Sequence, residues 1–146
     1  MDEFDASPII ETIWQAKKHC YLPILSENDK NPLIFSRYNS GDRLHANRYS
    51  ILEPVNISCN NILPENLDIV ITPLVAFDLH GHRLGAGGGY YDRTFAFLQA
   101  HPRERPCMIG LAYASQQADS LPTDPWDIPL HFVLTEKEFI TITSTV

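Results

Sequence analysis

The sequence has few cysteines and no long hydrophobic run. Its three cysteines, Cys20, Cys59 and Cys107, are far apart and show no CxxC or Cys/His ligand spacing. They therefore predict reduced thiols rather than a disulfide framework or a zinc site. No stretch approaches the length of a membrane span, and the acidic start MDEFDASP is not followed by the apolar core of a signal peptide. We expect a cytoplasmic protein that has no membrane partner.

Positive charge is also scarce. The sequence has 11 Lys and Arg residues against 18 Asp and Glu residues, which gives a formal net charge of −7 and a pI near 5.2. This is the wrong sign for a protein that binds the phosphate backbone, so nucleic acid is not an expected partner. A small anion could still bind where backbone N–H groups and a few cationic side chains are gathered locally.

The rest of the composition is that of a folded protein. Of the 146 residues, 44% are hydrophobic and 20% are charged, which predicts one globular domain covering residues 1–146. The expected elements are helices over 7–18 and 90–100, strands over 20–25, 33–38, 67–72, 106–114 and 131–135, and a hairpin turning at 80–81. Ser7 before Pro8 is expected to cap the first helix. The run LDIVIT predicts a central parallel strand that Pro73 ends, and residues 39–64 are expected to be mostly irregular. The pattern indicates an α/β fold.

One segment carries chemistry. Residues 83–93, RLGAGGGYYDR, place four glycines directly before an expected helix start. Such a loop lets backbone N–H groups converge on an anion without Cβ atoms in the way, and a helix N-terminus adds a partial positive charge. Phosphate is the natural ligand.

The generic nucleotide-binding motifs do not match this segment. No Gly-Lys-Ser/Thr follows, so it is not a P-loop, and Tyr90 stands where a dinucleotide fingerprint has its third glycine. A dehydrogenase is accordingly disfavoured. The alternative is a glycine turn that binds nothing. Tyr90 and Tyr91 are expected to divide between stacking on a ligand and packing, and His80 and His82 are more typical of solvated turn residues than of catalytic ones.

Taken together, these residues resemble the 5-formyltetrahydrofolate cyclo-ligase family, also called methenyltetrahydrofolate synthetase. The resemblance rests on residues 83–93 with Phe77-Asp78-x-His80-Gly81, and on Glu3-Phe4-Asp5, Pro23, Ile51-Leu52-Glu53-Pro54, Gly110-Leu111-Ala112-Tyr113, Leu121-Pro122, Asp127 and Thr135-Glu136. It implies a three-layer α/β/α fold with a mainly parallel central sheet, of the NagB/RpiA/CoA transferase-like kind. It also implies ATP- and Mg²⁺-dependent closure of 5-formyltetrahydrofolate to 5,10-methenyltetrahydrofolate.

The resemblance further implies a set of site residues, while no catalytic side chain is identified. ATP contacts would be Arg83, Leu84, Gly85, Ala86, Gly87, Gly88, Gly89, Tyr90 and Tyr91; folate contacts would be Glu3, Ala86, Gly87, Gly88, Gly89 and Tyr90; and Mg²⁺ ligands would be Asp92 and Asp127. Carboxylates suit a hard cation between phosphates. Asp92 could instead serve only the helix dipole, and Asp127 could be a loop residue with Asp124 as the ligand.

Members of the family normally have a basic helix and a first strand ahead of the position of Glu3, and the sequence does not contain them. The resemblance thus implies a chain that is N-terminally truncated relative to the family. An uncovered strand edge would offer a route to self-association of an otherwise monomeric protein, and fewer cations would contact ATP. The alternative function is a non-catalytic paralogue that binds folate or nucleotide.

Overall fold

A computed structural model of the chain describes residues 4–25, 32–55, 61–85, 87–101 and 105–143. The chain divides into two compact units, one formed by Met1–Phe4 with Glu65–Val146 and the other by Asp5–Pro64. A 3-10 turn, η1 (Pro64–Asn66), lies at the boundary in the sequence. Each unit is described by itself, and the expectation of a single domain remains a prediction.

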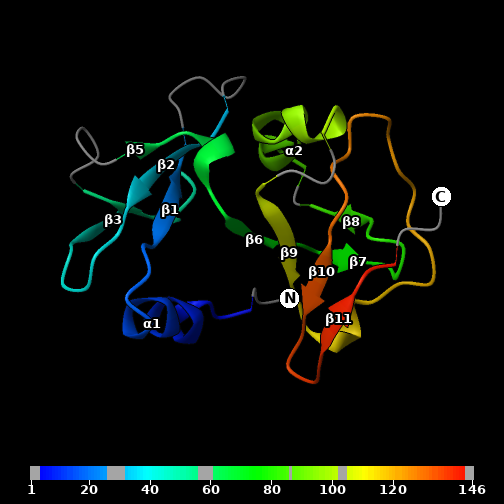
Figure 1. Ribbon diagram of the computed structural model, residues 1–146, viewed down its shortest axis with the longest axis horizontal. Helices are drawn as coiled ribbons and strands as arrows, with labels where there is room; N and C mark the ends of the chain where they lie inside the picture. Colours follow the sequence, from blue (N-terminus) through cyan, green and yellow to red (C-terminus); the bar gives the residue numbers. More distant parts are fainter. Residues whose placement is uncertain (1–3, 26–31, 56–60, 86, 102–104, 144–146) are drawn as a thin grey trace. The chain divides into compact units, whose positions relative to one another are not determined.

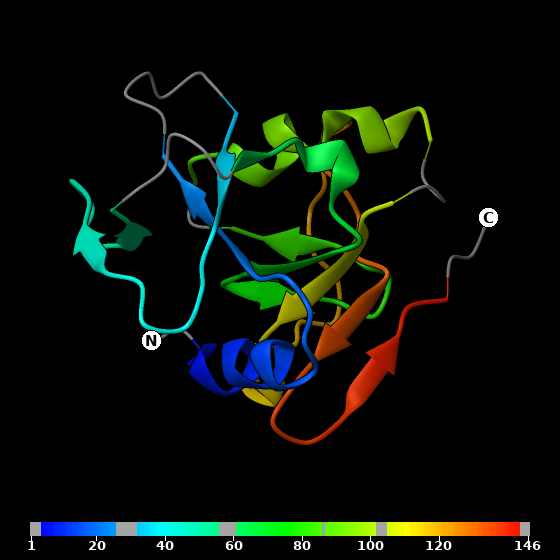
Figure 2. The ribbon, with the colours of Figure 1, turned by 60° about the vertical axis from the view of Figure 1, so that its left-hand side comes forward.

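The larger unit is built on a four-stranded mixed sheet. Its strands are β6 (Ile69–Pro73), β9 (Cys107–Leu111), β10 (Phe132–Leu134) and β11 (Phe139–Thr141), in the order β11-β10-β9-β6. The ribbons of these strands lie side by side in Figures 1 and 2. The β6–β9 and β9–β10 pairs are parallel, whereas β10 and β11 are antiparallel. The expected α/β class with a mostly parallel sheet is confirmed, while the three-layer NagB-like arrangement remains a prediction.

Two expectations about this sheet are wrong. Residues 67–72 predicted a central strand, but β6 stands at the end of the strand order among the described residues. The strand does end at Pro73, as expected, with Pro73 as its last residue opposite Leu111. The strand over 131–135 was expected to be the last, yet β11 follows it, paired through Val133 and Ile140.

A hairpin and a short helix lead from this sheet to the glycine loop. The hairpin pairs β7 (Ala76–Phe77) with β8 (Arg83–Leu84), and its predicted turn at residues 80–81 is confirmed. Gly81 has a φ of +90°, and a Cβ there would lie 2.8 Å from the carbonyl oxygen of Leu130, so only glycine fits. Beyond the loop come α2 (Tyr90–Thr94) and two 3-10 turns, η2 (Ala96–Gln99) and, after β9, η3 (Ala114–Gln116).

The core of the larger unit lies against the sheet. Phe77, Phe95, Met108 and Val133 have no solvent exposure. The spacing of Tyr91, Phe95 and Leu98 predicts the apolar side of a helix over 90–100; Phe95 and Leu98 are buried and Tyr91 is half-buried. The hairpin and the segment that follows the glycine loop are therefore anchored to the sheet by apolar side chains.

The smaller unit is antiparallel. Its elements are α1 (Ser7–Gln15), β1 (Tyr21–Ile24), β2 (Ile34–Arg37), β3 (Leu44–Ala46), β4 (Leu52–Pro54) and β5 (Asn61–Ile62), with sheets β1-β2-β5 and β3-β4. Residues 39–64 are thus less irregular than expected. The predicted cap is wrong: Ala6 is the N-cap, and Asp5 Oδ1 accepts the Ser7 N–H at 3.0 Å. Glu53 is buried and accepts bonds from the Leu25 N–H and from Asn47 Nδ2.

Cys20 and Cys107 are free thiols, as expected, and burial raises the pKa of both; Cys59 lies outside the described residues. Within the described part of the chain, no helix is long and apolar enough to cross a membrane.

Candidate nucleotide-phosphate site

The glycine loop joins β8 to α2 in a conformation that requires glycine. Gly87 has a φ of +103° and Gly89, the N-cap of α2, has a φ of +66°. L residues are strained in this region. A Cβ on Gly88 would lie 2.7 Å from the ring of Tyr90, whereas a Cβ on Gly87 would meet nothing within 4 Å. The backbone at Gly87 is therefore open to an approaching ligand. Ala86 lies outside the described residues.

The helix after the loop is shorter than predicted. Residues 90–100 form one helical turn, α2, which gives way to η2 at Ala96. A five-residue helix has few aligned peptide dipoles, so the macrodipole expected at its start is weak. The capacity of this loop to bind an anion must come from its backbone N–H groups and from neighbouring cations.

Arg83 is one cation that the fold fixes beside the loop. Its side chain is 7% exposed, and its Nη2 donates to Asp92 Oδ1 at 2.9 Å. The guanidinium lies 5.8 Å from the centre of the Tyr91 ring. Arg83 Nε is buried and has no hydrogen-bond partner among the described residues. A buried hydrogen-bond donor without a partner destabilises the folded state. A ligand oxygen that accepts a hydrogen bond from Arg83 Nε would remove this cost.

Asp92 and Asp127, the two predicted metal ligands, belong to neighbouring parts of the larger unit. Asp92 Oδ1 accepts the Ile128 N–H at 3.0 Å as well as the Arg83 bond, so the chain at residues 127–128 lies against Asp92. Asp127 Oδ2 in turn accepts the Asp124 N–H at 2.9 Å. Asp92 is thus more than a first-turn carboxylate, since it joins β8, α2 and the segment before β10.

A cleft adjoins these groups. Its volume is about 180 Å³, and it is lined by His82, Arg83, Thr123, Asp124, Asp127, Ile128 and Pro129. In the described part of the chain, no cluster of three or more His, Cys, Asp or Glu side chains could hold a metal. The described side chains at this site therefore do not coordinate a metal ion by themselves. Mg²⁺ is commonly held by one or two carboxylates, with phosphates and water as the other ligands, and a pair of aspartates fits that pattern.

Tyr90 and Tyr91, the first two residues of α2, both contact other side chains of the protein. Arg93 Nη1 donates to the Gly88 carbonyl oxygen at 2.6 Å, and its guanidinium lies 5.0 Å from the Tyr90 ring centre. The Tyr91 ring stacks at 6.4 Å on Phe95. Packing is thus part of the role of each ring. That one of them also stacks on a ligand stays a prediction.

The position of Glu3 lies outside the described residues, but its neighbour is informative. The Phe4 ring lies 4.8 Å from the ring of Tyr113, which follows β9. The carboxyl ends of parallel strands are the usual place for ligands in open α/β sheets. Tyr113 stands just past that end of β9, so Phe4 lies at the edge of the sheet where a ligand is expected.

The sequence did not predict that Asp78 and His82 are hydrogen-bonded to each other. Asp78 has no solvent exposure, and its carboxylate accepts the N–H groups of His80, His82 and Leu121 and a bond from His82 Nδ1 at 2.9 Å. Burial acts to raise the pKa of Asp78, and the hydrogen bonds from Leu121, His82 and His80 outweigh it, so the pKa lies below its usual value. The spacing Asp-x-His-Gly-His around the turn was the available signal.

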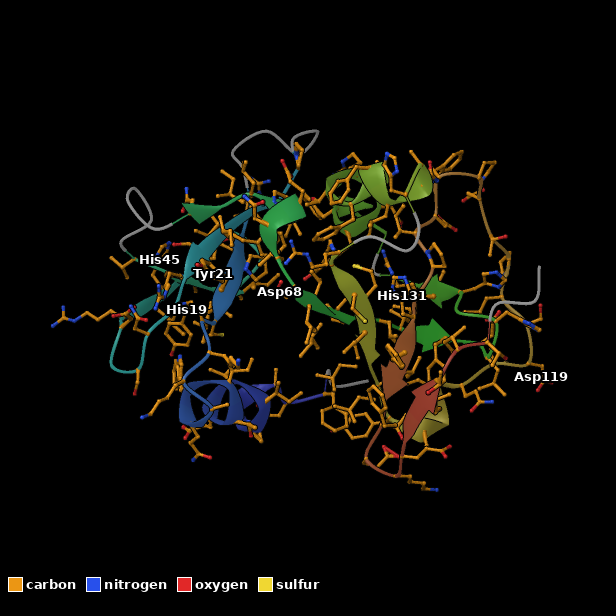
Figure 3. The ribbon with its side chains drawn as sticks, viewed as in Figure 1. His19, Tyr21, His45, Asp68, Asp119 and His131 are labelled. Atoms are coloured by element: carbon orange, nitrogen blue, oxygen red, sulfur yellow. The ribbon has the colours of Figure 1, made fainter. Side chains whose placement is uncertain are left out.

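His131 has a different role. The Met108 N–H donates to His131 Nδ1 at 2.9 Å, which ties β9 to the residue before β10, where Figure 3 labels it. Asp68, also labelled there, pairs with Arg105 at 2.8 Å, and both side chains are about three-quarters exposed. These contacts are structural, so neither residue is a candidate for the site.

An α/β unit in which a glycine loop follows a buried arginine, and in which that arginine lines a cleft with two carboxylates, is typical of proteins that bind phosphate groups. Comparison with known proteins narrows this class. The model of the 5-formyltetrahydrofolate cyclo-ligase family matches residues 1–136. The chain belongs to this family.

Named relatives and solved structures agree with that assignment. The chain is 44% identical to the 5-formyltetrahydrofolate cyclo-ligases of Haemophilus influenzae and Escherichia coli, over 90% and 93% of its own length and 69% and 73% of theirs. The 5,10-methenyltetrahydrofolate synthetase structure from Aquifex aeolicus matches 96% of the chain with a TM-score of 0.72 and 34% identity. The synthetase from Mycoplasma pneumoniae matches 90% with a TM-score of 0.60 and 28% identity. The chain spans 66% and 65% of those two structures.

Proposed function

We propose that this chain closes 5-formyltetrahydrofolate to 5,10-methenyltetrahydrofolate, using ATP and Mg²⁺ and releasing ADP and phosphate. The observation that carries the proposal is that Arg83, two residues before Gly85 of the glycine loop, lines a cleft with Asp124 and Asp127 and is paired with Asp92, in a chain that belongs to the cyclo-ligase family. The proposal extends to a monomeric, cytoplasmic enzyme that binds no nucleic acid.

The chemistry requires that a poor leaving group be activated. The formyl oxygen attacks the γ-phosphorus of ATP, the bond from that phosphorus to the β,γ-bridging oxygen breaks, and ADP departs. N10 of the folate then attacks the activated carbon and loses its proton to solvent. The carbon–oxygen bond breaks, and inorganic phosphate leaves with the former formyl oxygen. No electron is transferred to an oxidant or from a reductant.

The protein's part in such a reaction is positioning and charge stabilisation rather than nucleophilic attack. Residues 83–91 would hold the phosphates, with backbone N–H groups of the loop as donors and Arg83 Nε as a buried donor that lacks a partner among the described residues. Glu3 and residues 86–90 would contact the folate. Mg²⁺, held by Asp92 and Asp127 together with phosphate oxygens, would offset the charge that develops on the transferred group.

The test is a direct assay of the purified chain with 5-formyltetrahydrofolate, ATP and Mg²⁺. The appearance of methenyltetrahydrofolate, followed by its near-ultraviolet absorbance, with one ADP released per product, is the expected result. Nucleotide or folate binding without product would replace this proposal with the alternative of a binding protein. A chain that neither turns over nor binds ATP would overturn the site as well as the reaction.

A further inference from the structure

We propose that His82 hydrogen-bonds the polyphosphate end of the bound nucleotide through Nε2, in an orientation that the buried carboxylate of Asp78 holds. This inference rests on the proposed nucleotide site and adds a positioning contact to it. His82 lies at the start of the return arm of the hairpin, directly before Arg83.

The geometry around Asp78 fixes which nitrogen of His82 is available. Asp78 Oδ1 accepts the N–H groups of His80 and His82 at 2.9 and 3.0 Å, while Oδ2 lies 2.9 Å from His82 Nδ1 and 3.0 Å from the Leu121 nitrogen. An ionised carboxylate can only accept hydrogen bonds. His82 Nδ1 therefore donates to Asp78, and Nε2 is the ring nitrogen left for a ligand. Because phosphate oxygens accept hydrogen bonds, the proposed contact is made by the imidazolium form of His82, in which Nε2 also carries a proton and donates.

The free nitrogen belongs to a side chain at the cleft. The His82 side chain is 36% exposed, whereas Asp78 beneath it is fully buried, and His82 lines the cleft together with Arg83 and Asp127. Among the described residues, Nε2 has no hydrogen-bond partner. A ring held from below by a buried carboxylate loses little further freedom when it contacts a ligand, which favours binding.

The cleft fits the phosphate end of the nucleotide better than the folate. Its volume of about 180 Å³ is smaller than the roughly 300–1,000 Å³ of a pocket that encloses a drug-sized ligand. It therefore accommodates part of a ligand. Its charged lining, Arg83 with Asp124 and Asp127, suits phosphate oxygens and a metal rather than a flat aromatic ring.

Two substitutions separate the ligand contact from a purely structural role. The amide of His82→Asn reaches the position of Nδ1 and keeps the bond to Asp78, but it removes Nε2. The amide of His82→Gln reaches the position of Nε2 and gives up the bond to Asp78. His80→Asn is the matched control: His80 donates to Asp78 through its backbone N–H, and it is not among the residues that line the cleft.

The readouts are the Kd for Mg-ATP by isothermal titration calorimetry, KM and kcat in the folate assay, and Tm. His82→Asn should keep the wild-type Tm and bind Mg-ATP about 10-fold more weakly or worse, the loss expected for one charge-assisted hydrogen bond. His82→Gln should melt at a lower temperature and keep the Kd within about 3-fold. Its KM for ATP should follow its Kd, and kcat should change little in both variants. His80→Asn should match the wild type.

Wild-type affinity in His82→Asn would overturn the inference, whatever His82→Gln shows. If His82→Asn loses Tm together with affinity, recovery of the Kd in His82→Gln supports the contact, and failure to recover it overturns the contact. Absence of Mg-ATP binding in the wild-type chain would overturn the nucleotide site itself. The two failures are therefore distinguishable, because the second is seen before any variant is made.

Discussion

Substitution of Gly87 by valine is the sharpest test of the phosphate loop. A Cβ at this position would meet no protein atom within 4 Å, so the folded chain has room for the side chain. The backbone conformation is unfavourable for an L residue, with a φ of +103°, and that strain costs about 1–2 kcal/mol. A domain of ordinary stability, about 5–15 kcal/mol, remains folded after such a loss.

The effect on ligand binding should be far larger than the effect on stability. The valine side chain would occupy the open space through which phosphate oxygens reach the backbone N–H groups. Loss of two charge-assisted hydrogen bonds, each worth about 1.5–3 kcal/mol, corresponds to about 3–6 kcal/mol, or two to four orders of magnitude in Kd. Titration calorimetry with Mg-ATP and a thermal melt of the same sample measure both quantities.

Gly41 supplies a matched control. It lies in the turn between β2 and β3, its φ is +89°, and a Cβ there also meets nothing within 4 Å. Gly41→Val should therefore cost a similar amount of stability and leave Mg-ATP binding unchanged. An unaltered Kd in Gly87→Val would refute the phosphate loop, and equal losses of affinity in both variants would show that backbone strain is the cause.

Three further outcomes are expected. Hydrogen bonds that outweigh burial lower the pKa of Asp78. The ionised carboxylate therefore stabilises the folded state above about pH 4, and this stabilisation is lost as the pH falls through the folded pKa. In urea melts, Asp78→Asn should make the free energy of unfolding depend less on pH in the acid range. Arg83→Lys should weaken Mg-ATP binding about 10-fold, whereas Arg105→Lys, in a pair that is 73% and 76% exposed, should not. Asp127→Asn should raise the Mg²⁺ concentration needed for half-maximal turnover, and the exposed Asp119→Asn should leave it unchanged.

Local patterns predicted the parts of the fold that local physics decides. The turn at Gly81 and the burial of Phe95 followed from neighbouring residues, and both are present. The sequence did not reveal β11 or the pairing of β3 with β4, because strands of three residues carry too little periodicity to be distinguished from loop. The cap of α1 was misassigned because Asp5 and Ser7 both have cap chemistry, and only the geometry distinguishes them.

The site depends on contacts that no window of sequence contains. The backbone of Ile128 binds Asp92 across 36 positions, and the backbone of Leu121 binds Asp78 across 43. The motif therefore named candidate residues, while the partners that orient them came from tertiary structure. Asp78 illustrates the difference, since its place before the turn predicts a local role only.

The hairpin turn explains how an acidic chain could present the proposed anion site. With a net charge of −7, the overall field opposes a triphosphate, so the few cations near the ligand must be held in place. The six residues from Asp78 to Arg83 do this in two ways: they bury one negative charge, and they hold one cation in place. The carboxylate of Asp78 points into the interior, where backbone N–H groups satisfy it, and Arg83 on the return arm is held by Asp92. The turn thus directs negative charge inward and places Arg83 beside the glycine loop, with an Nε that no described residue pairs with.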